Sequence, residues 1–218
     1  MSDPSPTAPL RVVVLGANGS TGREVVRAAQ ARGLDVVAAV RRPETMDGAG
    51  VEVAPIDLGD HASLVRAIRG ADAVVSCLGH GSLRASAKPT TLYSDSARAY
   101  RAAMREAGCS RILVLSSGGV VQDDAAPWFY TKLLRRYLIN TYVDMARMET
   151  ILEESDGIEA TAVRLTYLLD GESKPFLVED ERLGRGSFKI HFVDAGRFVA
   201  DELVERAWVG KRPVLGYP

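Results

Sequence analysis

Cysteine and histidine, the residue types most often found at metal and redox sites, are scarce in this chain of 218 residues. It has two cysteines and three histidines, and no group of them has the short spacing typical of metal ligands, so we expect no metal site. Cys77 lies within an apolar run and Cys109 just before another. We therefore expect both to be reduced, structural thiols and expect no disulfide.

The chain also lacks an excess of one charge and a long hydrophobic run. Its 27 basic and 28 acidic residues give a net charge of −1, which favours neither nucleic acid nor an anionic membrane as a partner. No apolar run approaches the roughly 20 residues that span a bilayer. Residues 1–9 hold three prolines and no Lys or Arg, unlike a signal peptide, so we expect a disordered tail. These features predict a cytoplasmic protein. Its oligomeric state is left open between a monomer and a homodimer.

Short runs rich in Val, Leu and Ile recur along the chain and predict strands that are buried on both faces. The runs are Leu10–Leu15, Val36–Val40, Val51–Ala54, Ala73–Cys77, Ile112–Leu115 and Ala160–Leu165. The predicted helices between or after them are Arg23–Arg32, Ala62–Ile68, Asp95–Ala107 and residues 129–155. Glycines that mark helix ends follow as Gly33, Gly70, Gly108 and Gly157. This alternation predicts one α/β domain over residues 10–218, with a doubly wound, mostly parallel sheet and helices on both faces.

The regular alternation ends after Leu165. Residues 166–187 contain several Gly and Pro residues and little periodicity, and a final helix at about 193–207 and a short strand, Val214–Leu215, follow. An irregular segment late in such a fold often covers the ligand crevice at the carboxyl ends of the strands. We therefore expect residues 166–192 to cover the substrate.

Three glycines separate the first predicted strand from the first predicted helix, in the stretch GANGSTG. Glycine permits a phosphate to approach the free N–H groups of a helix start closely. Gly16 would end the strand, Gly19 would face a pyrophosphate, and Gly22 would allow close packing of helix on strand. Short polar groups that cap the helix or contact phosphate would come from Asn18, Ser20 and Thr21. The alternative is a tight turn without a ligand.

The end of the second predicted strand indicates which dinucleotide is preferred. Domains that bind NAD usually place Asp or Glu here to hold the ribose hydroxyls, whereas this chain has Arg41 and Arg42. A guanidinium pairs with a 2′-phosphate and can stack on adenine. The two arginines therefore predict NADP(H) in preference to NAD(H), unless they are ordinary solvated residues.

Taken together, these stretches resemble the atypical short-chain dehydrogenase/reductases that have an NAD(P)H-binding Rossmann domain. The resemblance is greatest to the subgroup of biliverdin-IXβ (flavin) reductase and the NmrA-like proteins. It rests on GANGSTG, RRPE (41–44), IDLGD (56–60), VVSCLG (74–79), LVLSS (113–117), METILEESDGIEATAVRL (148–165) and VDAGRFVADEL (193–203).

By this resemblance, Asp57 and Leu58 border adenine. Further cofactor contacts are implied for Cys77, Leu78 and Gly79 along the ribose and pyrophosphate, and for Leu165 and Thr166 at the nicotinamide. Without the resemblance, two alternatives are equally open: Asp57 caps the next helix, and Cys77 and Leu78 are ordinary core residues.

The catalytic Tyr-x-x-x-Lys pair common in short-chain reductases is missing. Tyr130 is followed four residues later by Leu134, and Lys132 is preceded four residues earlier by Trp128. Tyr130 as a proton donor and Lys132 as a ribose ligand therefore stay as weaker expectations. Ser116 and Ser117 stand where the family's serine belongs, and we expect one of them to donate a hydrogen bond to the substrate or to the nicotinamide amide. The alternative for either serine is a role in a turn.

Three further residues are possible substrate contacts, each with an ordinary structural alternative. His80 follows Gly79, so it could reach the cofactor phosphates or an acidic substrate, and His191 lies in a stretch that borders the pocket in relatives. Trp128 could stack on a flat acceptor or simply pack in the core.

The resemblance implies an NADPH-dependent reductase of a small conjugated acceptor, because the subgroup works with a positioned serine and solvent protons. The flavin, quinone and tetrapyrrole classes fit this expectation. Two alternatives stay open: a non-catalytic NADP(H)-binding sensor of the NmrA-like type, and a redox-neutral isomerase or epimerase on the same fold.

Overall fold

The computed structural model describes residues 8–46, 50–79, 88–121, 135–184 and 186–218. Within these ranges an eight-stranded sheet has the order β3-β2-β1-β4-β5-β6-β10-β8. All neighbours in it are parallel except β8 and β10. The strands are β1 (Arg11–Leu15), β2 (Asp35–Val40), β3 (Glu52–Pro55), β4 (Ala73–Ser76), β5 (Arg111–Ser117), β6 (Glu159–Leu165), β8 (Leu177–Asp180) and β10 (Pro213–Gly216).

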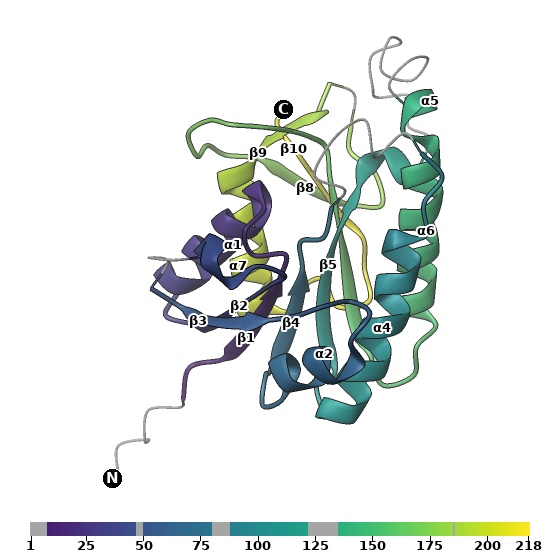
Figure 1. Ribbon diagram of the computed structural model, residues 1–218. Helices are drawn as coiled ribbons and strands as arrows, with labels where there is room; N and C mark the ends of the chain where they lie inside the picture. Colours follow the sequence, from purple (N-terminus) through teal and green to yellow (C-terminus); the bar gives the residue numbers. More distant parts are fainter. Residues whose placement is uncertain (1–7, 47–49, 80–87, 122–134, 185) are drawn as a thin grey trace, which may run out of the picture.

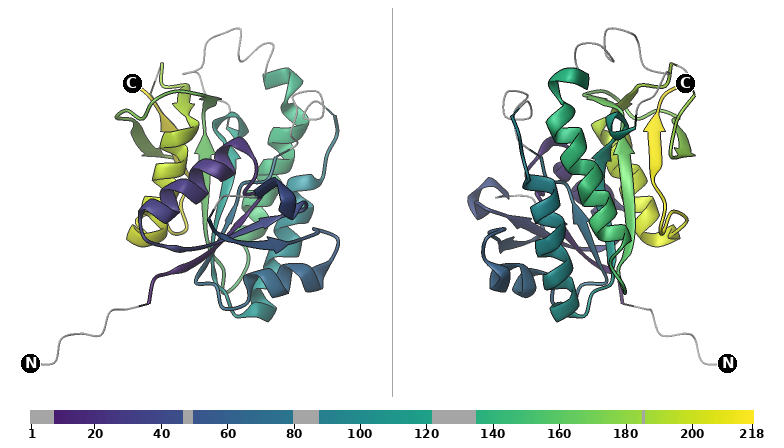
Figure 2. Two further views of the ribbon diagram at one scale, coloured as in Figure 1. Left: turned by 60° about the vertical axis from the view of Figure 1, so that its left-hand side comes forward. Right: turned by 90° about the vertical axis from the view of Figure 1, so that its right-hand side faces the viewer.

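Helices cover both faces of this sheet, as Figures 1 and 2 show. One face carries α1 (Ser20–Ala31) and α7 (Phe192–Glu205), which pack on each other. The other carries α2 (His61–Ile68), α4 (Leu92–Ala107) and α6 (Ile139–Glu153). The short elements are the helix α5 (Arg135–Tyr137) and the 3-10 turns η1 (Pro43–Met46) and η2 (Gly118–Val120).

The central strands have continuous apolar sequences because helices cover both faces of the sheet. Along β1, Val12 and Val14 face the cluster that contains α1 and α7, whereas Val13 and Leu15 face the cluster of α2 and α4. All four side chains are buried. The doubly wound, mostly parallel α/β fold is thereby confirmed. The four glycines that mark helix ends all have φ between 75° and 77°, the left-handed conformation expected at these positions.

Two parts of the prediction differ from the structure. Residues 166–187 are not irregular throughout, since they contain β7 (Tyr167–Leu169), which pairs with β9 (Lys189–His191), and the edge strand β8. The side chains of β8 are mostly exposed, so no apolar run marks this strand. Of the long helix expected over 129–155, the described part is divided by a turn at Leu138.

Candidate functional site

A cavity of about 760 Å³ lies where the carboxyl ends of the parallel strands meet. Its walls come from the residues that follow β1 to β4 and from the ends of β5 and β6. Thirteen of the predicted cofactor contacts line it: Gly16, Asn18, Gly19, Ser20, Thr21, Arg41, Arg42, Asp57, Leu58, Cys77, Leu78, Gly79 and Leu165. The strand ends therefore bring together residues that lie up to 149 positions apart in the sequence.

The start of α1 leaves its backbone N–H groups to the cavity. Gly19 is the N-cap residue, and no side chain caps the helix. A Cβ on Gly16 would lie 3.0 Å from the carbonyl oxygen of Cys77, and one on Gly22 only 2.3 Å from that of Gly16. A Cβ on Gly19 would meet nothing nearer than 3.5 Å. Gly16 and Gly22 thus permit the turn itself, whereas Gly19 leaves open space at the helix start.

The polar residues of this loop do not cap α1 as the sequence analysis allowed. Asn18, Ser20 and Thr21 all line the cavity, so their polar groups stay available to a ligand. The loop is braced from outside, because the Arg23 guanidinium donates to the carbonyl oxygens of Asn18 and Thr45 at 3.1 and 2.8 Å. An uncapped helix start with a braced glycine loop suits a phosphate group.

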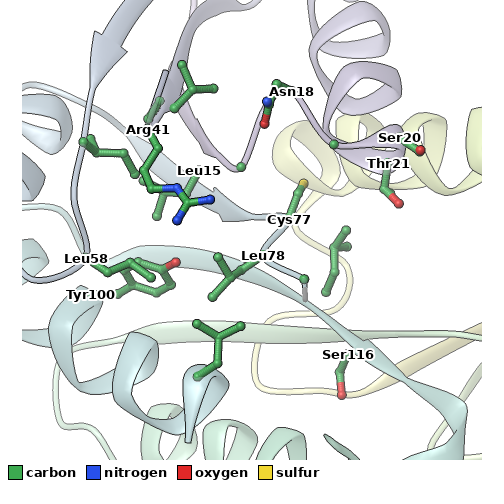
Figure 3. Close-up of a pocket in the computed structure, with 18 of the residues that line it drawn as sticks. Leu15, Asn18, Ser20, Thr21, Arg41, Leu58, Cys77, Leu78, Tyr100 and Ser116 are labelled. Carbon is green, nitrogen blue, oxygen red and sulfur yellow. The ribbon is translucent and has the colours of Figure 1, made fainter. Parts of the chain in front are cut away.

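Two exposed arginines lie at the end of β2 and line one side of the cavity. Figure 3 shows Arg41 on this side and Ser116 on the other, with Leu78 between them. Asp57 lines the same side, where its carboxylate accepts a hydrogen bond from the Gly59 N–H at 2.8 Å. It does not cap α2, whose N-cap residue is Asp60.

Cys77 lines the cavity and directly follows β4. Burial raises the pKa of its thiol to about 12, so the thiol is neutral at physiological pH and is a poor nucleophile. Cys77 therefore contributes shape and apolar surface rather than chemistry.

The two serines at the end of β5 differ in their surroundings. Ser116 is buried, lines the cavity, and donates to the Glu149 carboxylate on α6 at 2.5 Å. Ser117 Oγ accepts from the Gly119 N–H at 3.2 Å and caps η2, which is the turn role considered from the sequence. Of the two serines, only Ser116 lines the cavity.

Three other predicted contacts lie off the cavity wall. Gly22 packs against the turn, and the Thr166 hydroxyl donates to the Leu215 carbonyl oxygen at 2.8 Å. The His191 ring lies 2.8 Å from the Glu172 carbonyl oxygen and packs edge-on against Tyr217. The remaining predicted residues, His80, Trp128, Tyr130 and Lys132, lie outside the described residues.

Several residues of the cavity wall were not predicted from the sequence, because their apolar or aromatic side chains on regular elements are typical of ordinary core positions. Leu92 and Tyr100 come from α4, Met145 from α6 and Leu168 from β7. Tyr100 is almost fully buried beside Leu58 (Figure 3), and burial raises the pKa of its hydroxyl. A neutral phenol at this place can hydrogen-bond to a ligand.

Two classes of site are not found in the part of the chain that the structure describes. No cluster of three or more His, Cys, Asp or Glu residues has the arrangement of a metal site there. Of the helices in those ranges, none combines the length and apolar character needed to cross a bilayer.

Comparisons with known proteins agree with this geometry. A model of a family described as NAD(P)H-binding matches residues 16–206. A (4-alkanoyl-5-oxo-2,5-dihydrofuran-3-yl)methyl phosphate reductase from Streptomyces griseus is 50% identical over 66 residues, which are 29% of this chain and 23% of that relative. The matched segment thus spans less than a quarter of the relative's length.

Solved structures resemble the whole chain at low sequence identity, and this likeness concerns the fold. A protein from Streptococcus pneumoniae described as a candidate NADH-flavin reductase has a TM-score of 0.76 at 21% identity, covering 96% of this chain and all of that one. A short-chain dehydrogenase/reductase from Veillonella parvula, solved in complex with NADP, has a TM-score of 0.76 at 17% identity, covering 96% and 95% of the two chains.

Proposed function

The chain belongs to the NAD(P)H-binding family, and from this premise we propose that it is an NADPH-dependent reductase of a small conjugated acceptor. The observation that carries the proposal is the course of the cavity. It runs from two arginines, past an uncapped helix start, to a serine at the end of β5. A dinucleotide needs these three environments in this order, for its 2′-phosphate, its pyrophosphate and its nicotinamide.

The residues present fit such a cofactor. The free N–H groups at the start of α1 and the space beside Gly19 suit the pyrophosphate. Arg41 and Arg42 offer two guanidinium groups for the 2′-phosphate. Ile56, Leu58 and Tyr100 supply a largely apolar wall for adenine. The nicotinamide then lies at the opposite side, beside Ser116.

The chain's part in the chemistry is binding and orientation. When bound, the reduced cofactor supplies a hydride, which carries two electrons. Leu115, Leu165 and Leu168 line the cavity with Ser116 and would hold a flat acceptor against the nicotinamide and exclude water. Flavins, quinones and tetrapyrroles accept hydride readily and take their proton from solvent, so positioning supplies much of the rate. The candidate flavin reductase among the similar structures supports this class.

The cofactor preference is tested by replacing Arg41 and Arg42 together with Ala. We expect NADP⁺ to bind at least about tenfold more weakly, because charge-assisted hydrogen bonds to the 2′-phosphate are lost. NAD⁺ binding should change less than about twofold. The control is the double change Arg66→Ala on α2 and Arg69→Ala directly after it, two exposed arginines that do not line the cavity. Equal weakening of both dinucleotides would contradict the preference for NADP(H).

The reductase activity is tested by following NADPH absorbance with FMN, a quinone or biliverdin as the acceptor. Turnover with one of these acceptors supports the proposal. Tight NADPH binding without any loss of absorbance, across all three classes, would contradict it and favour a cofactor-binding sensor.

A further inference from the structure

Ser116 has a single hydroxyl proton, and the structure indicates where this proton goes. Its Oγ lies 2.5 Å from Glu149 Oε1, between the end of β5 and α6. A hydroxyl can donate one hydrogen bond, whereas an ionised carboxylate can only accept. Whether Glu149 donates or accepts therefore decides what Ser116 can offer to the cavity.

Glu149 is surrounded by guanidinium groups. Arg164 donates to both carboxylate oxygens, from Nη2 at 2.7 Å and from Nε at 3.2 Å. The Nε of Arg212 lies 3.5 Å from Oε2. The side chains of Glu149 and Arg164 are 4% and 5% exposed, so water competes little for these bonds. Since a guanidinium can only donate, Glu149 acts as an acceptor toward Arg164 and likewise accepts the Ser116 proton.

Ser116 consequently presents only its oxygen lone pairs to the cavity. The neighbouring wall residues Leu115, Leu165 and Leu168 are apolar, and the hydroxyls of Ser117 and Thr166 are engaged elsewhere. A ligand group that bonds to Ser116 must therefore bring its own N–H or O–H. The nicotinamide carboxamide carries both a carbonyl oxygen and an NH₂ group, and an acceptor selects the NH₂.

We propose that Glu149 is a positioning residue, which fixes Ser116 as a hydrogen-bond acceptor for the carboxamide NH₂ of the nicotinamide. This inference rests on the proposed function, because it requires the nicotinamide to lie beside Ser116. In this role Ser116 accepts a hydrogen bond from the cofactor and does not donate a proton to the substrate.

The test compares binding of NADP⁺ with binding of its 3-acetylpyridine analogue by calorimetry, without any acceptor present. The analogue keeps the carbonyl and replaces the NH₂ with a methyl group. We expect the wild type to prefer NADP⁺ by about fivefold, the effect of one hydrogen bond. In Ser116→Ala this ratio falls to about one. In Glu149→Gln the amide faces Ser116 as a donor, the Ser116 proton turns to the cavity, and the ratio falls likewise.

A matched control separates positioning from stability. Glu202 is an equally buried carboxylate, paired with Arg111 at 2.6 Å at the other end of β5. Glu202→Gln should lower the unfolding temperature as Glu149→Gln does but keep the wild-type binding ratio. Should Glu149→Gln fail to fold, Glu149→Asp keeps the charge for Arg164 while shortening the reach to Ser116, and the ratio again falls.

The possible results distinguish a failure of the positioning role from a failure of the proposed function. A wild-type ratio of one, or a Glu149 variant that folds and keeps the wild-type ratio, overturns the positioning role. Absence of NADP⁺ binding to the wild type overturns the proposed function instead.

Discussion

At the scale of single residues, the glycines of the first turn have separable tasks. A Cβ on Gly22 would clash with backbone, at 2.3 Å from the Gly16 carbonyl oxygen. Gly22→Ala should therefore lower the free energy of unfolding by about 1–3 kcal/mol through overpacking. Thermal and urea unfolding of the ligand-free protein measure this loss. An unchanged stability would show that the close contact is not required.

Gly19→Ala should give the opposite result. Gly19 has φ −69° and ψ 163°, which alanine adopts freely, and its Cβ would have space in the ligand-free protein. We expect a stability change within about 0.5 kcal/mol, together with NADP⁺ binding weakened at least about tenfold if a phosphate occupies that space. Unchanged NADP⁺ affinity in Gly19→Ala would exclude a phosphate from this position.

Residue patterns predicted the glycine loop, the arginines and the serines, because each directly follows an apolar run whose end marks a strand end. They could not predict the Ser116–Glu149 contact. Glu149 lies 33 positions further on, on α6, and the apolar pattern of this helix gives no sign that Glu149 faces inward. Tyr100 was missed for a similar reason, since a buried aromatic residue on a helix reads as core.

At the scale of elements, hydrogen bonds around the buried Asp194 hold the late segment of the chain to α7. The Asp194 carboxylate, in the first turn of α7, accepts from Ser173 Oγ at 2.7 Å, from the Lys174 N–H at 3.2 Å and from the Tyr217 hydroxyl at 2.5 Å. The cluster thus connects the segment before β8, the helix and the chain end after β10. Local periodicity does not encode contacts of this kind, so the residue pattern of 166–187 indicates only an irregular segment.

This cluster makes stability depend on pH in the alkaline range. Burial, with the hydrogen bond to Asp194, raises the pKa of Tyr217 to about 12, whereas an unfolded tyrosine titrates at about 10. Between these values the unfolded chain releases a proton that the folded protein keeps, so stability falls as the pH rises. Urea unfolding from pH 9 to 12 should show a steeper loss for the wild type than for Tyr217→Phe. Parallel curves would contradict this assignment.

At the scale of the whole molecule, a buried ion pair joins the amino end of the sheet to α7. Arg111 and Glu202 are each 1% exposed, and the carboxylate also accepts from the Trp208 N–H at 3.1 Å. Glu202→Ala leaves the buried guanidinium without its counter-ion, so we expect a loss of about 3–5 kcal/mol in unfolding free energy. NADP⁺ affinity should stay within about twofold under conditions where the variant is folded, because the pair lies at the opposite end of β5 from the cavity. A large loss of affinity would show that the two ends of the sheet are coupled.

The order of the strands places the cavity. The strands β1 and β4 lie side by side, and the order of the strands along the sheet reverses direction between them. Ligands of doubly wound sheets bind at this place. Alternating strands and helices were sufficient to predict this architecture. The edge strand β8 was not predictable, because its pairing with β10 depends on tertiary contact rather than on an apolar pattern.

Titration calorimetry of the wild-type protein with NADP⁺ and with NAD⁺ tests the central claim most directly. We expect one saturable site per chain for NADP⁺, with an affinity at least about tenfold higher than for NAD⁺. The absence of saturable binding for both dinucleotides would contradict the assignment of this cavity as a dinucleotide site.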